Sequence, residues 1–350
     1  MRPVTVPFFI SHQGCPHTCV FCDQRTISGS AGRLPGADEM LAAIAAWRGS
    51  AGERPLEAAF FGGSFTALAD ELQADLLAPL QPLLTSGQLD AVRLSTRPDY
   101  IDDQRVAWLK KNGVHTIELG IQSLDDAVLA ASGRGHSADQ SEAAMACIKR
   151  HGLRLGAQLM PGLPGDTPQA SLTSLERVIA AGADFIRIYP ALVLRGTELA
   201  RRYAAGDYLP LDLEGGIALC KLLLLRALQA DLPVIRIGLQ ADQGLNADTV
   251  LAGCWHPALG QLVRSGLYRD LIGRHVYPGE EVIIRCHPSR LSDVLGQKKC
   301  HLNELAERGI RARVLPDAAL EKTELVIKKG SECFNYNLLT DLHYSIDEVY

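Results

Sequence analysis

The sequence lacks the features of a membrane or secreted protein. None of its apolar runs approaches the roughly 20 residues that span a bilayer. Met1 is followed by the strand-like stretch VTVPFFI, and not by a charged region and an apolar segment. The nine cysteines are an odd number, which does not suit a framework of paired disulfides. We therefore expect a soluble, cytoplasmic protein with no membrane contact, in a compartment that keeps thiols reduced.

The sequence also lacks a strong charge of either sign. The net charge of −5 gives no overall electrostatic reason to bind nucleic acid. Residues 271–330 carry eleven Lys or Arg against eight Asp or Glu, a net charge of +3, which is more typical of a solvated surface than of a nucleic-acid site. With 47% hydrophobic and 21% charged residues, the composition is ordinary for a globular protein. The 350 residues are enough for one large domain with a smaller one attached.

Three cysteines near the start carry most of the information. Cys15, Cys19 and Cys22 follow a C-x3-C-x2-C spacing, with Phe21 directly before the third. Three thiolates this close can hold three irons of a [4Fe–4S] cube and leave the fourth iron without a protein ligand. An open iron can bind a substrate or cofactor, so the pattern predicts a reactive cluster.

A structural zinc site is the alternative, with His17 or His12 as a fourth ligand. Zinc sites more often pair C-x2-C units and have a clear fourth ligand. The other six cysteines are scattered without metal spacing, which is typical of small buried hydrophobic residues. A zinc-stabilised binding module therefore remains an alternative hypothesis. Reconstitution with iron and sulfide distinguishes an iron–sulfur cluster from a zinc site.

Short β-branched or aromatic runs alternate with longer helical patterns. The predicted strands are Val4–Ile10, Ala58–Gly62, Ala91–Thr96, Thr116–Ile121, Arg154–Met160 and Phe185–Ile188. The predicted helices are Ala37–Trp47, Ala69–Leu84, Asp102–Asn112, Asp125–Ser132, Ala138–His151, Pro168–Ala181 and Leu213–Ala230, the last followed by a strand-like run at Val234–Leu239. Six βα units in regular order predict an α/β fold with parallel strands. We expect a partial (βα)6 TIM-like barrel over residues 1–240.

Beyond about residue 240 this pattern stops. Strand-like runs at 280–287, 310–316 and 323–329 and a helical run at Leu291–Arg308 predict a small α+β domain over residues 241–350. We expect this domain to close the substrate side of the barrel. Its most unusual segment is GCWHP, in which Cys254 and His256 are candidate catalytic residues beside Trp255. The alternative is that Trp255 fills the core and His256 bonds to backbone.

Barrels place their chemistry on loops at the C-terminal ends of strands. The cysteine loop follows the first predicted strand, and three further conspicuous segments, 62–66, 120–123 and 161–165, also follow strands. Gly62 and Gly63 permit close approach of backbone to a ligand. Glu118 and Gln122 are four residues apart, so in a strand their side chains point to the same face. The amide of Gln122 can form hydrogen bonds with ribose hydroxyls.

Four segments together resemble the radical S-adenosylmethionine (SAM) superfamily. Besides the cysteine run, they are FFGGSFT at 60–66, STRPDYID at 95–102, LGIQSLDD at 119–126 and LMPGLPGDT at 159–167. They are most similar to the subgroup of the elongator catalytic subunit and the oxygen-independent coproporphyrinogen dehydrogenases. The resemblance covers roughly residues 4–240.

The resemblance implies a set of site residues. Cys15, Cys19 and Cys22 would ligate the [4Fe–4S] cluster, and Gly62, Gly63 and Ser64 would hold the methionine part of SAM. Gln122 would meet the ribose, and Arg134 would pair with the SAM carboxylate, a task that suits a guanidinium. Ser95 stands where relatives often have glutamate, and Gln158 stands where they often have an acidic residue or histidine. Together with Glu118, these two residues complete the candidate SAM contacts.

The implied activity is that of a radical SAM enzyme. One electron from a flavodoxin- or ferredoxin-type donor would cleave SAM to methionine and a 5′-deoxyadenosyl radical, which takes hydrogen from a substrate. The size and layout resemble the lyases of queuosine salvage, which favours a nucleoside or modified base, with tRNA as a possible partner. Porphyrinogen-type oxidative decarboxylation is an alternative. Acetyl transfer is not expected, because the chain is too short for the elongator acetyltransferase domain and shows no acetyl-coenzyme A loop.

Overall fold

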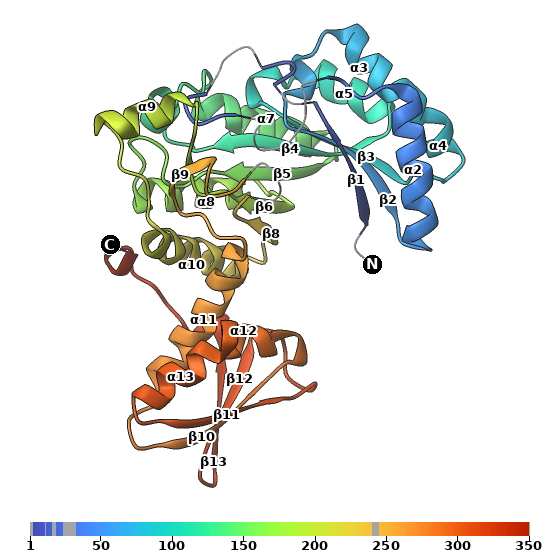
Figure 1. The fold of residues 1–350 in the computed structure, drawn as a ribbon. Helices are drawn as coiled ribbons and strands as arrows, with labels where there is room; N and C mark the ends of the chain where they lie inside the picture. The colour runs from blue at the N-terminus through green and yellow to red at the C-terminus, as the bar shows by residue number, and fades with distance from the viewer. Residues whose placement is uncertain (1–2, 11, 16–18, 24–32, 240–244, 350) are drawn as a thin grey trace.

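A computed structural model describes residues 3–10, 12–15, 19–23, 33–239 and 245–349. The chain forms two parts, a curled parallel sheet with helices on its outer face and a smaller sheet covered by helices (Figure 1). The predicted domain boundary at residues 240 and 241 lies outside the described residues. No described helix combines the length and the apolar character needed to cross a membrane.

The larger sheet contains seven parallel strands in the order β1-β2-β3-β4-β5-β6-β8. They are β1 (Val4–Phe9), β2 (Leu56–Phe61), β3 (Ala91–Thr96), β4 (Val114–Gln122), β5 (Arg154–Leu159), β6 (Phe185–Ile188) and β8 (Val234–Ile237). The six βα units and the partial barrel are confirmed. The run at Val234–Leu239 adds a seventh strand, which pairs with β6 and leaves β1 and β8 as the two edges.

Helices cover the outer face of this sheet. They are α2 (Ala37–Ala51), α3 (Asp70–Leu77), α4 (Gln81–Thr85), α5 (Asp103–Lys111), α6 (Asp126–Ala131), α7 (Ala138–Arg150), α8 (Pro168–Ala180) and α10 (Leu213–Gln229), whereas α9 (Glu198–Ala205) packs against β7 (Leu192–Leu194). The helix predicted over Ala69–Leu84 is broken by the 3-10 turn η2 (Ala78–Leu80), because Pro79 and Pro82 cannot donate a backbone hydrogen bond. Side chains of Asp102, Asp125, Ser137 and Thr167 cap the helices that follow them.

The main core lies between the sheet and these helices. Strands β2 and β4 are buried along almost their whole length, as expected for parallel strands covered on one face and curled on the other. Phe60 is fully buried and contacts Phe65 with ring centroids 5.1 Å apart. The inner face of the curled sheet carries polar side chains, which brings the chemistry of the chain inside the barrel.

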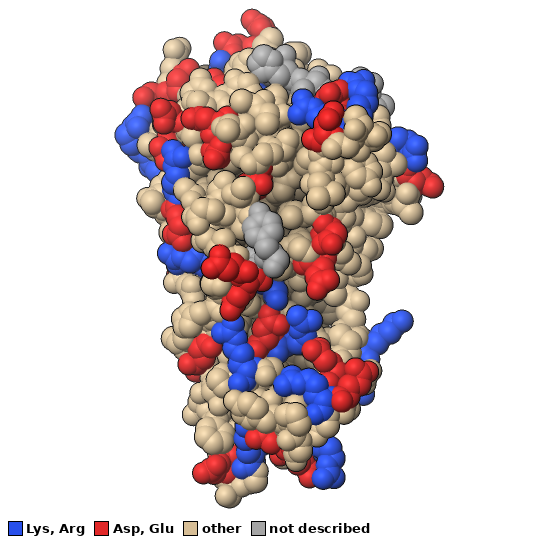
Figure 2. Space-filling view, turned by 90° about the vertical axis from the view of Figure 1, so that its left-hand side faces the viewer, with Lys and Arg blue, Asp and Glu red and all other residues tan. Residues whose placement is uncertain are grey.

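The smaller part is a four-stranded sheet in the order β11-β10-β12-β13. Its elements are α11 (Leu259–His275), β10 (Glu281–Cys286), α12 (Leu291–Leu295), α13 (Cys300–Glu307), β11 (Arg311–Pro316), β12 (Glu324–Lys329), β13 (Glu332–Asn337) and α14 (Leu338–Asp341). The helix predicted over Leu291–Arg308 breaks where Lys298 and Lys299 take positive φ angles. Acidic and basic side chains are interspersed over this part in Figure 2, which agrees with a solvated surface.

The smaller part joins the barrel on its helical outside. Helices α11 and α14 pack on α10, which itself covers the sheet (Figure 1). A two-stranded antiparallel ribbon connects the two parts, with β7 (Leu192–Leu194) paired to β9 (Val250–Gly253). This ribbon was not predicted from the sequence.

Candidate functional site

A cavity of about 610 Å³ opens on the inner face of the curled sheet. Cys15, Cys19 and Cys22 all line it, together with the glycine pair that follows β2. The ends of β3, β4, β5 and β6 contribute the other walls. Three of the four segments that the sequence singled out after separate strands therefore meet at one cavity, which is within the size range of ligand sites. The fourth segment, 161–165, contributes no residue to the lining.

The cysteine loop is held against the glycine pair by backbone contacts. The amide of His12 donates to the carbonyl of Gly62 at 3.0 Å, and the amide of Ser64 donates to the carbonyl of Gln13 at 3.0 Å. A Cβ on Gly63 would lie 2.6 Å from the oxygen of Gln13 and closer still to that of Ile10. Gly63 therefore permits the cysteine loop to pack on the turn, and its missing side chain does not simply open space for a ligand.

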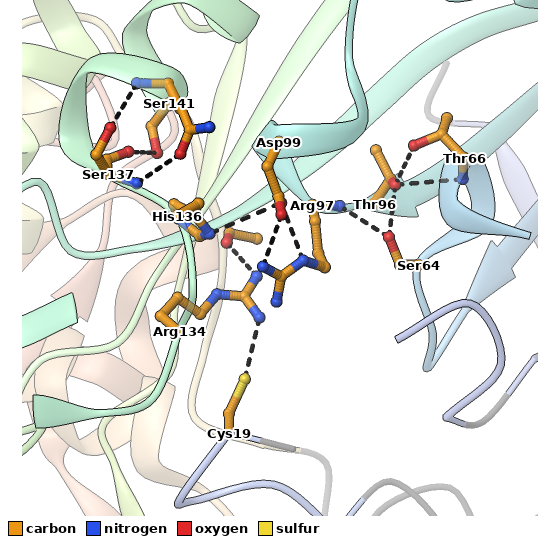
Figure 3. Close-up of polar contacts among 12 residues, drawn as sticks. Cys19, Ser64, Thr66, Thr96, Arg97, Asp99, Arg134, His136, Ser137 and Ser141 are labelled. Carbon is orange, nitrogen blue, oxygen red and sulfur yellow. Dashed lines mark hydrogen bonds and ion pairs between the residues drawn. The ribbon is translucent and has the colours of Figure 1, made fainter. Parts of the chain in front are cut away.

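The side chain of Ser64, one of the three residues expected to hold the methionine part of SAM, does not line the cavity. Its hydroxyl is fully buried, lies 3.0 Å from that of Thr96, and accepts from the amide of Arg97 at 3.3 Å (Figure 3). The hydroxyl of Thr96 also bonds Thr66 at 2.6 Å. This network fixes the turn after β2 to the end of β3.

Arg97 is a cavity residue that the sequence reasoning did not select, although it lies in the STRPDYID motif. Its Nε and Nη2 donate to the two carboxylate oxygens of Asp99 at 2.9 and 2.8 Å (Figure 3). This bidentate pair orients the guanidinium and leaves Nη1 buried without a partner among the described residues.

His136 completes this cluster on the far side of Asp99. Its Nδ1 lies 4.0 Å from the carboxylate. Burial lowers the pKa of His136 to about 3, and the nearby Arg134 and Arg97 charges add to the effect. The imidazole is therefore neutral at physiological pH, and Asp99 remains available to Arg97.

Arg134 connects the cysteine loop to β4. Its Nη1 donates to the sulfur of Cys19 at 3.3 Å, and its Nη2 donates to the carbonyl of Gly120 (Figure 3). A Cβ on Gly120 would lie 2.7 Å from Nη2, so only glycine leaves room for this contact. The position places a cation beside the cysteines, where the thiolates of a bound cluster would be negative.

Gln122, Ser95 and Gln158, which the resemblance implies as SAM contacts, all line the cavity. Gln122 has a positive φ of 71°, an unfavourable backbone region for a residue other than glycine. Its Oε1 and the hydroxyl of Ser95 are buried without partners among the described residues. Such strain is tolerated where a site requires a particular side-chain direction.

Glu118 does not line the cavity, and the prediction that it contacts SAM is not supported by its position. It is fully buried and bonds Arg93 at 2.5 Å and Arg187 at 2.6 Å. Burial alone would raise the pKa of Glu118, but the charges of Arg187 and Arg93 outweigh it and lower the pKa. Glu118 is thus an ionised partner that holds two arginines inside the barrel.

Cys254 and His256 also lie outside the cavity lining, contrary to the expectation that they face substrate. Cys254 is buried in the main core, and burial raises the pKa of its thiol to about 12. His256 Nδ1 accepts from the amide of Ala258 at 3.0 Å. Trp255 packs behind the wall formed by Leu192 and Leu194. No described residue beyond Leu239 lines the cavity, so the ribbon strand β7 covers the side that the smaller domain was expected to close.

The residues around the cavity fit an iron–sulfur cluster and SAM. Arg97 Nη1, Arg134 Nε, Gln122 Oε1 and Ser95 Oγ are buried polar atoms without partners among the described residues. Each costs roughly 1–3 kcal/mol if nothing bonds it. A ligand with carboxylate, amino and hydroxyl groups would satisfy them beside three thiols. His12 lines the cavity, whereas His17, the other ligand considered for zinc, lies outside the described residues.

Comparisons with known proteins agree with this arrangement. Residues 9–177 match the family model described as the radical SAM superfamily, and residues 183–269 match the model described as the radical SAM C-terminal domain. Members of the superfamily use a [4Fe–4S] cluster and SAM.

Three similar proteins illustrate the range of relatives. The tRNA uridine(34) acetyltransferase of Methanocaldococcus infernus is 32% identical over 123 residues, which are 34% of this chain and 23% of that protein. Protein YhcC of Escherichia coli is 28% identical over 155 residues, 43% of this chain and 50% of that protein. The matched segments thus span about a quarter to a half of these relatives. The structure of archaeal Elp3 from Methanocaldococcus infernus has the same fold, with a TM-score of 0.57 and 20% identity over 92% of this chain and 72% of that one.

Proposed function

Because the chain belongs to the radical SAM superfamily, we propose that it cleaves SAM at a [4Fe–4S] cluster bound by Cys15, Cys19 and Cys22 and acts on a nucleoside or modified base. The observation that carries the proposal is the single cavity that all three cysteines share with the unpartnered polar atoms of Ser95, Arg97, Gln122 and Arg134.

The cluster and SAM, when bound, supply a primary carbon radical, because one electron breaks the C5′–S bond and releases methionine. The protein binds and orients these groups. Arg97 and Arg134 place two cations beside the cysteines and favour anionic groups there. Gln122 offers an amide to hydroxyl groups, and Ser95 offers a hydroxyl. The electron comes from a donor of the flavodoxin or ferredoxin class.

A nucleobase substrate is supported by the character of the remaining lining. Phe9, Phe61 and Tyr189 present aromatic surface to the cavity, and aromatic side chains stack on bases. One relative is named as a tRNA uridine(34) acetyltransferase, which favours a base in tRNA as one form of the substrate. The charges on the face seen in Figure 2 are mixed, without an extended basic surface there for tRNA. A small nucleoside is the other form of the substrate.

Anaerobic reconstitution with iron and sulfide tests the cofactor part of the proposal. We expect about four irons per chain and, with reductant, formation of 5′-deoxyadenosine from SAM. The triple variant Cys15→Ala, Cys19→Ala, Cys22→Ala should lose both. The matched control is Cys300→Ala, Cys333→Ala, which removes two exposed cysteines far along the chain. A protein that takes up one zinc and no iron, or a triple variant with full iron, would contradict the proposal.

The substrate part needs a separate measurement. Nucleosides and tRNA should each be tested for stimulation of 5′-deoxyadenosine formation, with deuterated substrate used to detect transfer of the hydrogen. Stimulation with deuterium transfer is the expected result. Active SAM cleavage that neither nucleosides nor tRNA stimulate would contradict the nucleoside substrate while leaving the cofactor assignment intact.

A further inference from the structure

Strand pairing places three polar side chains side by side across one wall of the cavity. Gln158 on β5 pairs with Arg187 on β6, which pairs with Arg236 on β8. All three line the cavity. They form a row of hydrogen-bond donors from three neighbouring strands, ending at the edge strand of the sheet.

Arg187, the middle residue of the row, already has hydrogen-bond partners. Arg187 donates from Nε to Glu118 at 2.6 Å and from Nη1 to the hydroxyl of Tyr189 at 3.0 Å. Its charge is balanced by a buried carboxylate, and its position is fixed. It therefore acts as a rigid neighbour for the two residues on either side.

Gln158 and Arg236, the outer residues of the row, still have N–H groups without partners among the described residues. Arg236 makes one hydrogen bond, from Nε to the carbonyl of Gly238 at 3.3 Å, and pairs with no carboxylate among the described residues. The side-chain amide of Gln158 has no hydrogen-bond partner in the described part of the chain. Both present free N–H groups to the cavity.

The charge of the cavity lining is one-sided. It includes the arginines Arg97, Arg134, Arg187 and Arg236, and no described Asp or Glu. Carboxylates behind the wall balance two of them, Asp99 for Arg97 and Glu118 for Arg187. Arg134 lies against Cys19 and belongs to the cofactor side. Arg236 is left as a cation that no described carboxylate balances, and its neighbour on the next strand is also a cation, so an anion in the cavity would be attracted to it.

We propose that Arg236 and Gln158 form a subsite for an oxyanion of the substrate, a phosphate ester or a carboxylate. The inference rests on the proposed function and narrows its substrate to a nucleoside or base that carries such a group. A guanidinium and an amide can bind two oxygens of either group together.

Arg236 is the member of the subsite that lies away from the cofactor residues, whereas Gln158, on β5, is also among the candidate SAM contacts. Arg134 contacts Gly120 on β4, and β8 lies three strands further along the sheet. At about 4.8 Å between neighbouring strands, β8 lies roughly 14 Å along the sheet from β4. Strand β8 is one edge of the sheet, and β1 is the other.

Calorimetric titration of the full-length, cluster-loaded protein tests the proposal. The probes are inorganic phosphate and acetate, each with the cofactor site filled by S-adenosylhomocysteine. We expect one of the two to bind, and Arg236→Gln to weaken it by about 10- to 100-fold, the loss of a charge-assisted bond of roughly 1.5–3 kcal/mol. Arg236→Lys should retain part of the affinity. Arg313→Gln, at an exposed position on β11, is the control and should change nothing.

Each other outcome overturns the proposal. Equal anion binding by Arg236→Gln and the unaltered protein would exclude the subsite. Weaker binding of S-adenosylhomocysteine by Arg236→Gln would assign Arg236 to the cofactor. Binding of phosphate would indicate a phosphate ester in the substrate, and binding of acetate would indicate a carboxylate. Binding of neither anion would also refute the proposed subsite. If no cluster assembles, the same titration on the cluster-free chain still tests Arg236, so failure of the proposed function is distinguishable from failure of the subsite.

Discussion

The contact between Gly63 and the cysteine loop gives the sharpest test of how the fold supports a cluster. Gly63→Ala would add a Cβ 2.6 Å from the backbone oxygen of Gln13 and nearer still to that of Ile10, closer than the 3.0 Å that real contacts respect. Both neighbours are backbone atoms within five residues of Cys15, so relief must come from a shift of the loop that carries the cysteine. Overpacking of this kind costs about 1–3 kcal/mol.

That cost should appear as weaker cluster retention, by roughly 5- to 150-fold at about 1.4 kcal/mol per tenfold. The assay is the iron content after reconstitution, followed by the extent of cluster loss to a chelator over a range of concentrations. Gly36→Ala is the matched control, because its φ is −78° and nothing lies within 4 Å of the added Cβ. Full iron and unchanged chelator resistance in Gly63→Ala, with only SAM affinity reduced, would refute the packing argument and assign the glycine to ligand access.

Three further predictions concern other parts of the site. Gln122→Ala and Gln122→Gly should both lose about 0.5–1.5 kcal/mol of SAM binding free energy, measured by calorimetry. The glycine variant should unfold at a higher temperature than the alanine variant, because glycine adopts the φ of 71° at this position without strain. Equal unfolding temperatures would argue against backbone strain. Glu118→Gln should reduce the free energy of unfolding in urea by about 3–5 kcal/mol, because it leaves Arg187 without a described carboxylate and Arg93 with Glu57 alone. Glu142→Gln breaks a half-exposed pair with Arg177 and should cost less than about 1 kcal/mol. Similar losses in the two variants would contradict the buried network. Because the pKa of His136 is about 3 when folded and about 6.5 when unfolded, the unfolded chain takes up the proton first, so stability is highest above pH 6.5 and falls toward pH 3. His136→Gln should remove about 1.4 kcal/mol of the loss between pH 7.5 and 5.5, and an unchanged pH profile would show that His136 is not held neutral.

The order of the elements was predictable because hydrophobic runs and helical patterns alternate along the chain. The interruption of a helix and the two-stranded ribbon were harder to predict. Pro79 and Pro82 lie in an otherwise helical pattern, and no local sequence feature marks the pairing of β7 with β9. At the site, the three cysteines were identifiable from their spacing alone. Glu118 was misplaced because strand parity gives the face of a side chain but not its partner, and Arg93 and Arg187 are distant in sequence.

The same limit applies to the residues that were missed. Arg97 lies in a recognised motif, but its orientation depends on Asp99, and its access to the cavity depends on the turn held by Ser64. Cys254 has the chemistry of a hydrogen donor, but it follows β9 and packs in the core against Leu213 and Gly216 of α10. Arg236 gave no sequence signal, because its neighbours on the cavity wall come from β5 and β6 through strand pairing.

The distribution of charge inside the barrel explains how two anionic groups can occupy one cavity without competing. Buried carboxylates balance the arginines that only shape the walls, Arg93 and Arg187. Unbalanced cations remain beside the cysteines, at Arg134, and at the opposite edge strand, at Arg236. A cofactor carboxylate and a substrate oxyanion would then bind at different parts of the cavity, whose lining also includes the aromatic side chains of Phe9 and Phe61. Since both attractions act inside a water-poor site, they orient the two molecules before any bond changes, which is the contribution a protein makes when its cofactor supplies the reactive species.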